Sequence, residues 1–253
     1  MLFRSQQFKQ HLQAQSYDRV IDLQGLTKSA LVSRLARLNS GGQRIAMANR
    51  TEGSSYEAPT RWVADRLIEL PPHIHAVDRA RVVCAQALGY EVPDEFHAGM
   101  PLIVQPTAAQ LVVCVHGTSR EDKLWPEAHW LALGRRLLQC RQVPVFVHGN
   151  AAEQARSQRL SDALPGSQLW PALKLNELAV RMAAAQGVIG VDSGVSHIAV
   201  ALGLPHVQIY NFDTAWRTGP QHAKQQESVF AKPCPDVDSV WQAWLLMKQG
   251  GAS

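Results

Sequence analysis

The amino-acid sequence predicts an α/β protein with two lobes, of which the second is a doubly wound parallel sheet. Beyond residue 110, short apolar strands alternate with amphipathic helices, as they do in βαβ units. Residues 92–108 carry three prolines and little periodicity, so the linker is expected there, between lobes spanning 1–106 and 107–253. Only two strands are found before the linker, so the first lobe is expected to be an incomplete Rossmann-like lobe.

Apolar runs and the helical spacing of apolar residues predict the elements in order. In the first lobe the expected strands are Arg19–Leu23 and Gln43–Met47, and the expected helices are Leu2–Gln15, Thr27–Leu38, Thr60–Glu69 and Asp78–Leu88. In the second lobe the expected strands are Leu111–Val115, Val143–Val147, Val188–Val191 and His206–Tyr210. The helices that separate or follow them are Pro126–Gln139, Ala151–Ala163, Asn176–Ala185, Val195–Leu202 and Val237–Lys248.

The composition is that of a globular protein, because 46% of the 253 residues are hydrophobic and 18% are charged. The formal charge of +4 suits anionic ligands such as nucleotides or phosphorylated lipids. It is too small to indicate nucleic-acid binding, and no basic run with interleaved aromatic residues occurs. The four cysteines are scattered without a C-x-x-C pair, which indicates free thiols in a reducing compartment. No secretory signal or membrane-length apolar run is found, so we expect a cytoplasmic protein.

One stretch, Gly187–Tyr210, combines a buried strand, a polar loop, a small-residue helix and a second strand. Its polar groups stand at the carboxyl end of a strand, where open α/β sheets bind ligands. Because a pyrophosphate would repel a carboxylate, we expect Asp192 either to cap the following helix or to accept hydrogen bonds from sugar hydroxyls. Ser193 and Gly194, with the amides of the helix start, can hold a neighbouring anion. A histidine inside a helix, such as His197, is more often a packing residue, although a phosphate contact is possible.

The loop from His116 to Pro126 also leaves a strand and enters a helix. Its hydroxyls (Thr118 and Ser119), its amides and the ammonium of Lys123 are typical of a phosphate site. A solvated loop with a local Asp–Lys pair is the alternative. Because this loop and the Asp192 loop leave their strands in the same direction, the phosphate site is favoured.

Glu153 lies in the first turn of the helix that follows Gly149-Asn150. A carboxylate there complements the helix macrodipole, which is a sufficient structural role. It can equally accept hydrogen bonds from ribose hydroxyls, as acidic residues do in nucleotide-binding folds. The residue alone does not decide between the two.

No metal or cofactor is expected. The histidines and cysteines show no metal-ligand spacing. Asp236-Val-Asp238 matches a D-x-D pattern, but it lies between prolines and a helix, where turn and capping roles explain it.

Two motifs together, His116-Gly-Thr-Ser-Arg-Glu-Asp-Lys123-x-Trp-Pro126 and Val191-Asp-Ser-Gly-Val-Ser-His197, resemble the ADP-heptose:lipopolysaccharide heptosyltransferases. These are enzymes of glycosyltransferase family 9 with the GT-B fold, in which two Rossmann-like lobes face a cleft, and the likeness is to the type I members. In the first lobe, Tyr17–Ala30 and His75–Arg79 are also similar to the family. The resemblance runs nearly end to end.

The resemblance implies an inverting transfer of L-glycero-D-manno-heptose from ADP-heptose to a Kdo hydroxyl of the lipid A–Kdo acceptor. By motif position, Thr118, Ser119 and Lys123 would bind and neutralise the departing diphosphate, and Glu153 would hold the ribose. The remaining donor contacts implied are Leu173 at the adenine, Asp192 at the heptose, and Ser193, Gly194 and His197 beside the phosphates. Lys123 and Asp192 would be the catalytic residues, and lysine and helix-start amides would replace a metal ion.

The family's acceptor-side base is an aspartate in the loop after the first strand, and this sequence has no counterpart of it. We therefore expect an N-terminally truncated type I enzyme with an intact donor lobe. Asp22 is not expected to be the base, whereas Lys28 is a candidate for acceptor anions. Tyr56-Glu57 stands where the family often has Arg-Glu.

Two other hypotheses stay open. The chain can be an ADP-sugar binding module without turnover, or a family 9 enzyme with another acceptor, such as that of the type II enzymes. For the enzyme, an acceptor in the inner leaflet implies peripheral contact with the inner membrane from the cytoplasmic side.

Overall fold

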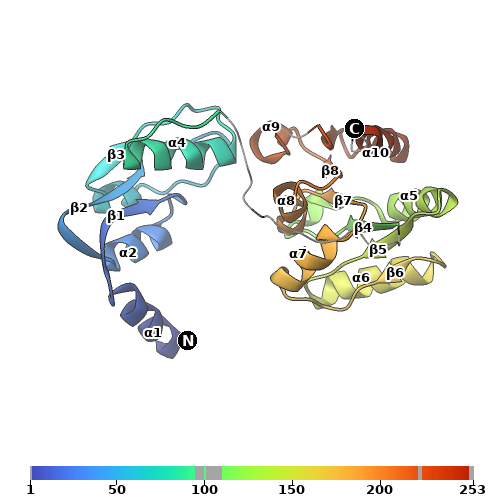
Figure 1. Cartoon of the computed structure of the whole chain (residues 1–253), viewed down its shortest axis with the longest axis horizontal. Helices are drawn as coiled ribbons and strands as arrows, with labels where there is room; N and C mark the ends of the chain where they lie inside the picture. Colours follow the sequence, from blue (N-terminus) through green and yellow to red (C-terminus); the bar gives the residue numbers. More distant parts are fainter. Residues whose placement is uncertain (1, 95–99, 101–109, 222–223, 251–253) are drawn as a thin grey trace. The chain divides into compact units, whose positions relative to one another are not determined.

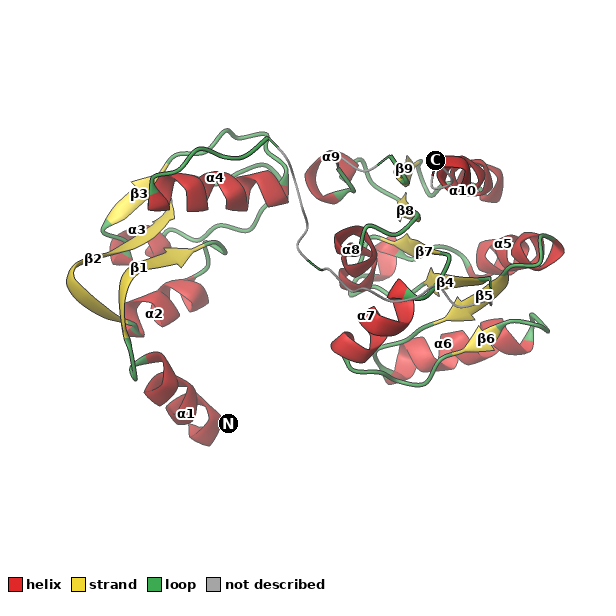
Figure 2. Ribbon diagram, viewed as in Figure 1, coloured by secondary structure: helices red, strands yellow, loops and turns green. Residues whose placement is uncertain are grey.

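The computed structural model describes residues 2–94, 100, 110–221 and 224–250 of the chain, and it divides the chain into two compact units. Unit 1 is Met1–Glu95 and unit 2 is Phe96–Ser253. Each is an α/β unit with a parallel sheet (Figures 1 and 2), so the predicted fold class is confirmed. The boundary predicted between residues 106 and 107 lies outside the described residues.

Unit 1 contains a three-stranded parallel sheet in the order β1-β2-β3, with β1 at Ser16–Asp22, β2 at Arg37–Met47 and β3 at Arg66–Ile68. Its helices are α1 (Leu2–Leu12), α2 (Thr27–Leu35), α3 (Pro59–Val63) and α4 (Ala76–Leu88). Helix α4 ends at Gly89, which adopts the left-handed conformation (φ 78°) that glycine accepts without strain. The hydrophobic core of unit 1 packs the ends of β2 and β3 against α4, and its buried residues are Ile45, Met47, Ile68, Leu70, Val83 and Ala87.

Three helix predictions in unit 1 are wrong at their C-terminal ends. The helix predicted to reach Gln15 ends at Leu12, and β1 begins at Ser16. The helix predicted to reach Leu38 ends at Leu35, and β2 begins at Arg37. The helix predicted for Thr60–Glu69 ends at Val63, after which Arg66–Ile68 pairs with β2 as β3. Pairing in the sheet outweighs the local helical spacing in β2 and in β3, and the burial of Ile68 adds to it in β3.

Unit 2 contains a six-stranded parallel sheet in the order β6-β5-β4-β7-β8-β9. The strands are β4 (Leu111–Val115), β5 (Val143–Phe146), β6 (Gln168–Leu169), β7 (Gly187–Val191), β8 (His206–Tyr210) and β9 (Gln226–Phe230). The helical elements are η1 (Glu121–Lys123), α5 (Glu127–Gln139), α6 (Ala151–Asp162), α7 (Leu175–Ala183), α8 (Gly194–Ala201), α9 (Ala215–Thr218) and α10 (Val237–Gly250). The chain runs outward from β4 to β6 and then returns to β7 on the other side of β4. The switch point, where such sheets bind ligands, therefore lies between β4 and β7.

Both faces of the unit 2 sheet are buried, which explains why its central strands read as continuous apolar runs. Side chains alternate along β4, with Val112 and Cys114 on one face and Val113 and Val115 on the other. The first face packs against α5, α6 and α10, and its largest side chains are Trp125, Trp130 and Trp244. The second packs against α7 and α8. Figure 1 shows α5 and α10 on one side of the strands and α7 and α8 on the other.

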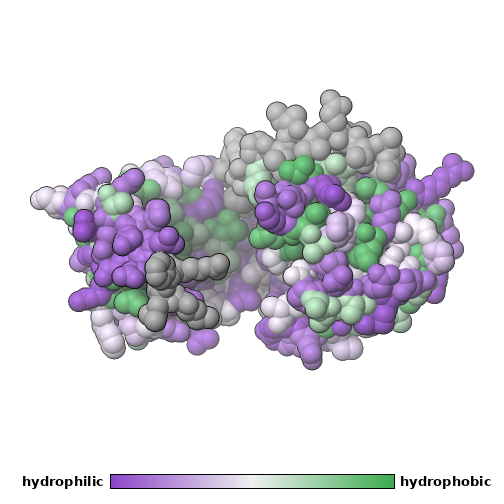
Figure 3. Space-filling model, turned by 90° about the horizontal axis from the view of Figure 1, so that it is seen from below, coloured by the Kyte–Doolittle hydropathy of each residue, from purple (hydrophilic) through white to green (hydrophobic). Residues whose placement is uncertain are grey.

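Within the described ranges, no helix has the length and apolar character needed to cross a membrane. On the face shown in Figure 3, hydrophilic residues cover most of unit 1, and patches of hydrophobic residues interrupt the hydrophilic surface of unit 2.

Candidate functional site

A cavity of about 730 Å³ opens at the carboxyl ends of the central strands of unit 2. The loops after β4, β5, β7 and β8 all contribute to its wall. All nine donor-site residues predicted from the sequence line it, namely Thr118, Ser119, Lys123, Glu153, Leu173, Asp192, Ser193, Gly194 and His197. The structure thus brings together residues up to 79 positions apart, from Thr118 to His197, while their individual roles stay predictions.

Lys123 and Asp192 form the central ion pair of the cavity. The Lys123 Nζ atom lies 2.6 Å from Asp192 Oδ2, and the two side chains are 21% and 8% exposed. Burial alone would raise the pKa of Asp192, but hydrogen bonds from His197 and Lys123 and the Lys123 charge outweigh it, so the pKa is lowered. The carboxylate is therefore charged at neutral pH, and it holds the ammonium at the switch point. An ammonium has three donors, so Lys123 can still donate to a ligand.

This pairing corrects two interpretations of the sequence. Lys123 does not form a local pair with Asp122, because Asp122 pairs with Arg120. Asp192 is not the cap of α8, because Ser193 holds that position and accepts a weak hydrogen bond (3.5 Å) from the Ser196 amide. The carboxylate is instead free of the helix and directed to Lys123.

His197 is a cavity residue and not a packing residue of α8. Its side chain is 43% exposed, and its Nε2 atom lies 3.5 Å from Asp192 Oδ1. The Nε2 atom of the fully buried Gln208, on β8, lies 3.5 Å from the same oxygen. Asp192 thus has a cation on one oxygen and two weaker partners on the other.

The β4 loop is fixed to the rest of the site by contacts on both sides of Lys123. Thr118 donates its hydroxyl to the carbonyl of Asp192 (3.1 Å), which ties the two central loops together. Asn211, directly after β8, donates its side-chain amide to the carbonyls of Asp122 and Leu124, each at 3.0 Å. Its two donors therefore hold the backbone on either side of Lys123. Asn211 was not predicted as a site residue, although its position directly after the correctly predicted strand β8 was a usable signal.

Glu153 faces the cavity from the first turn of α6. Its carboxylate accepts the Gly149 amide (2.7 Å), and its own amide donates to the Asn150 side chain (2.9 Å), which caps the helix. Gly117, in the β4 loop, lies so close that a Cβ there would be 2.5 Å from Glu153 Cδ. The carboxylate therefore rests against the Gly117 backbone, and the apolar Leu173 lines the same cavity. This arrangement suits a ribose and its base.

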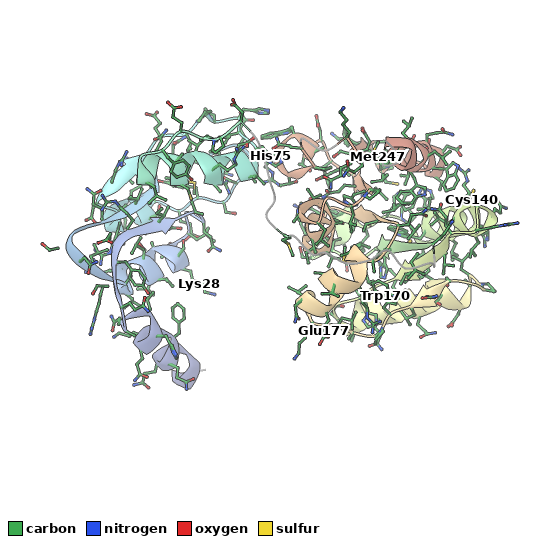
Figure 4. All side chains as sticks on the ribbon, in the orientation of Figure 1. Lys28, His75, Cys140, Trp170, Glu177 and Met247 are labelled. Atoms are coloured by element: carbon green, nitrogen blue, oxygen red, sulfur yellow. The ribbon has the colours of Figure 1, made fainter. Side chains whose placement is uncertain are left out.

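Lys28 lies on α2 of unit 1 (Figure 4), where it is exposed. It lines a separate groove of about 710 Å³ along β1. Asp22, in the same groove, accepts hydrogen bonds from the Gln24 and Gly25 amides and from the Ser29 hydroxyl, so it stabilises the turn into α2. Tyr56 and Glu57 are also engaged locally, with Tyr56 donating to the Ala48 carbonyl and Glu57 accepting the Thr27 amide.

Among the described residues, no three His, Cys, Asp or Glu side chains gather as a metal site requires. Asp236 accepts the Ser239 amide (2.7 Å) at the start of α10, and Asp238 pairs with Arg136. The D-x-D pattern therefore has the turn and capping role expected of it.

Comparison with known proteins agrees with this geometry. The model of glycosyltransferase family 9 (heptosyltransferase) matches residues 5–239. The chain is 32% identical to lipopolysaccharide heptosyltransferase 1 of Pseudomonas aeruginosa over 237 residues, which are 90% of this chain and 63% of that protein. It is similar to E. coli heptosyltransferase WaaC with ADP (TM-score 0.81, 29% identity, 98% of this chain and 77% of that chain). It is also similar to WaaC with ADP-2-deoxy-2-fluoro heptose (TM-score 0.78, 30% identity, 95% and 75%).

The chain spans about 63% of the length of the relative from P. aeruginosa. Within this chain, residues 5–239 match the family. The match covers both units and includes every residue of the cavity described above. The chain belongs to glycosyltransferase family 9, the heptosyltransferase family.

Proposed function

We propose that this chain transfers L-glycero-D-manno-heptose from ADP-heptose to a Kdo hydroxyl of lipid A–Kdo, with inversion at the transferred carbon. The observation that carries the proposal is the convergence of Lys123, Asp192 and Glu153 on one cavity in a member of family 9. The similarity to heptosyltransferase structures with ADP and with an ADP-heptose analogue supports the choice of donor.

The order of the loops supports one orientation of the donor. Glu153 and Leu173 form the part of the cavity that suits an adenosine. The hydroxyls of Thr118 and Ser119, the Lys123 ammonium and the amides at the start of α8 suit the diphosphate. Asp192, whose charge would repel phosphate, is suited to the hydroxyls of the heptose. The Asp192 carboxylate thus suits the sugar, whereas the amides at the start of α8, directly after it, suit the phosphates.

In this orientation Lys123 contributes most to the chemistry. Cleavage of the bond between heptose and phosphate leaves an additional negative charge on ADP. Lys123 lies in a partly buried site, with its ammonium already oriented by Asp192, so it stabilises that charge without a large rearrangement. We assign no residue to deprotonation of the acceptor hydroxyl, since Asp22 is committed to its turn.

The test is a transfer assay with ADP-heptose and lipid A–Kdo, with the product followed by mass spectrometry and ADP binding followed by calorimetry. We expect one heptose to be added to the acceptor, and ADP to bind in the micromolar to millimolar range. ADP binding without transfer would identify a binding module instead. Transfer only to an acceptor that already carries a heptose would identify a type II specificity.

We also propose that the protein acts at the cytoplasmic face of the inner membrane, as a peripheral protein. The lipid acceptor supports this proposal. So does the surface of unit 1, where Trp62 on α3 is 80% exposed and the basic residue Arg66 is also exposed. Sedimentation with vesicles tests it. Binding to anionic vesicles should exceed binding to zwitterionic ones, and equal or absent binding would contradict the proposal.

A further inference from the structure

Arg217 is a cavity residue to which the sequence analysis assigned no role. It lies on α9, the short helix after β8, and both Arg217 and Thr218 line the cavity. The side chain is half-buried, and the backbone is fixed by a hydrogen bond from the Arg217 amide to the Thr214 carbonyl (3.0 Å). Thr218 is joined to Tyr210 of β8 by a hydroxyl contact of 3.3 Å. Helix α9 is thus held against β8, the strand that precedes it.

The charges around the cavity show why a second cation matters. Its wall contains two carboxylates, Glu153 and Asp192, and two permanent cations, Lys123 and Arg217. With neutral histidines the formal charge of these lining residues is zero, and without Arg217 it would be −1. A diphosphate brings several negative charges, so the wall would oppose it if Lys123, already paired with Asp192, were the only cation.

The strand order places Arg217 at one end of the site. Along the sheet, the cavity residues follow β5 (Glu153), β4 (Lys123), β7 (Asp192) and β8 (Arg217), in that spatial order. Neighbouring strands are about 4.8 Å apart, so Glu153 and Arg217 follow strands about 14 Å apart. If the nucleoside lies beside Glu153, Arg217 stands at the opposite end, beyond Lys123.

The electrostatics of Tyr210 agree with this position. Burial raises the pKa of the Tyr210 phenol and the hydrogen bond with Thr218 lowers it, while the charge of Asp192 raises it further and the charge of Arg217 lowers it. The phenol is therefore influenced by both charges, and Asp192 and Arg217 both line the cavity.

We propose that Arg217 binds the distal phosphate of a nucleoside diphosphate-sugar, the phosphate that carries the sugar. The assignment rests on the proposed function, because it takes the orientation of the donor from it. A guanidinium presents paired donors to phosphate oxygens, so Arg217 complements Lys123, which acts as a point charge. Together the two cations enclose the part of the donor that becomes the leaving group.

The test compares ADP with AMP, which lacks the distal phosphate, by calorimetry on the full chain. Arg217→Gln should weaken ADP binding about tenfold or more and leave AMP binding nearly unchanged. Arg217→Lys should recover part of the loss. Arg135→Gln is the matched control, since Arg135 is exposed on α5 and outside the cavity wall, and it removes the same charge.

Each result has one meaning. Unchanged ADP binding in Arg217→Gln, or equal losses for ADP and AMP, would overturn the assignment, because the first excludes a contact and the second indicates general damage to the site. An equal loss of ADP binding in Arg135→Gln would also overturn it, in favour of a long-range charge effect. Wild-type protein that binds neither nucleotide would overturn this assignment and the proposed function together. ADP binding that depends on Arg217, without heptose transfer, would overturn only the proposed function.

Discussion

Replacing Lys123 with methionine is expected to weaken ADP binding about one hundredfold, because a charge-assisted contact to phosphate is lost inside a partly buried site. The same change leaves Asp192 buried without its cation, so the remaining carboxylate also repels the diphosphate. Calorimetry with ADP measures the effect. Lys224→Met, at an exposed lysine outside the cavity wall, is the control and should bind ADP as the wild type does.

The same variant should also lose stability at neutral pH. The folded protein lowers the pKa of Asp192 below its ordinary value of 3.8. The pair therefore adds stability above that pH, and the contribution is lost as the pH falls through the lowered folded value. Lys123→Met should lower the free energy of unfolding by about 1–3 kcal/mol at pH 7 and by less near pH 3. Denaturant unfolding at the two pH values measures this.

A double variant separates the two effects of Lys123. In Lys123→Met with Asp192→Asn, no buried charge is left unpaired, so most of the lost stability should return. ADP binding should stay weak, because the cation is still missing. If ADP binding returned with stability, Lys123 would be a structural partner of Asp192 and not a ligand of the diphosphate.

The sequence predicted the central strands and the loops between them well, and the edges of the sheets poorly. Strands β4 and β8 were predicted residue for residue. Strand β4 is buried on both faces and is an uninterrupted apolar run, whereas β8 also buries the polar His206 and Gln208. Strand β9, Gln226–Phe230, was missed, since it lies at the sheet edge and exposes the polar Glu227. Strand β3 has three residues and owes its conformation to pairing with β2, which no local pattern reveals.

For the site, the sequence predicted which residues converge but not how they pair. Parallel strands end at the same edge of a sheet, so the meeting of Lys123, Glu153 and Asp192 followed from the strands alone. The contact between Lys123 and Asp192 joins residues 69 positions apart, and it depends on the strand order β4-β7. Arg217 could not be predicted, because α9 is a single turn without periodicity.

Gly117→Ala is expected to weaken ADP binding about tenfold while leaving the binding of pyrophosphate nearly unchanged. A Cβ at Gly117 would lie 2.5 Å from Glu153 Cδ and 2.7 and 2.8 Å from its two oxygens, which no real contact allows. The carboxylate is the far end of a flexible side chain, so it would swing away at little cost to folding. Calorimetry with ADP and with pyrophosphate separates the nucleoside contact from the diphosphate contacts.

Gly149→Ala is the matched control for this prediction, since it adds the same methyl group on the other side of Glu153. There the new Cβ would lie 3.5 Å from Glu153 Oε2, an ordinary van der Waals distance, and the Gly149 amide that holds the carboxylate is retained. ADP binding should therefore change much less than in Gly117→Ala. Glu153→Gln should resemble Gly117→Ala, because it also weakens the acceptor for the ribose hydroxyls. If Gly117→Ala weakened pyrophosphate as much as ADP, the methyl group would be disturbing the whole β4 loop, and Glu153 would have only its structural role at the start of α6.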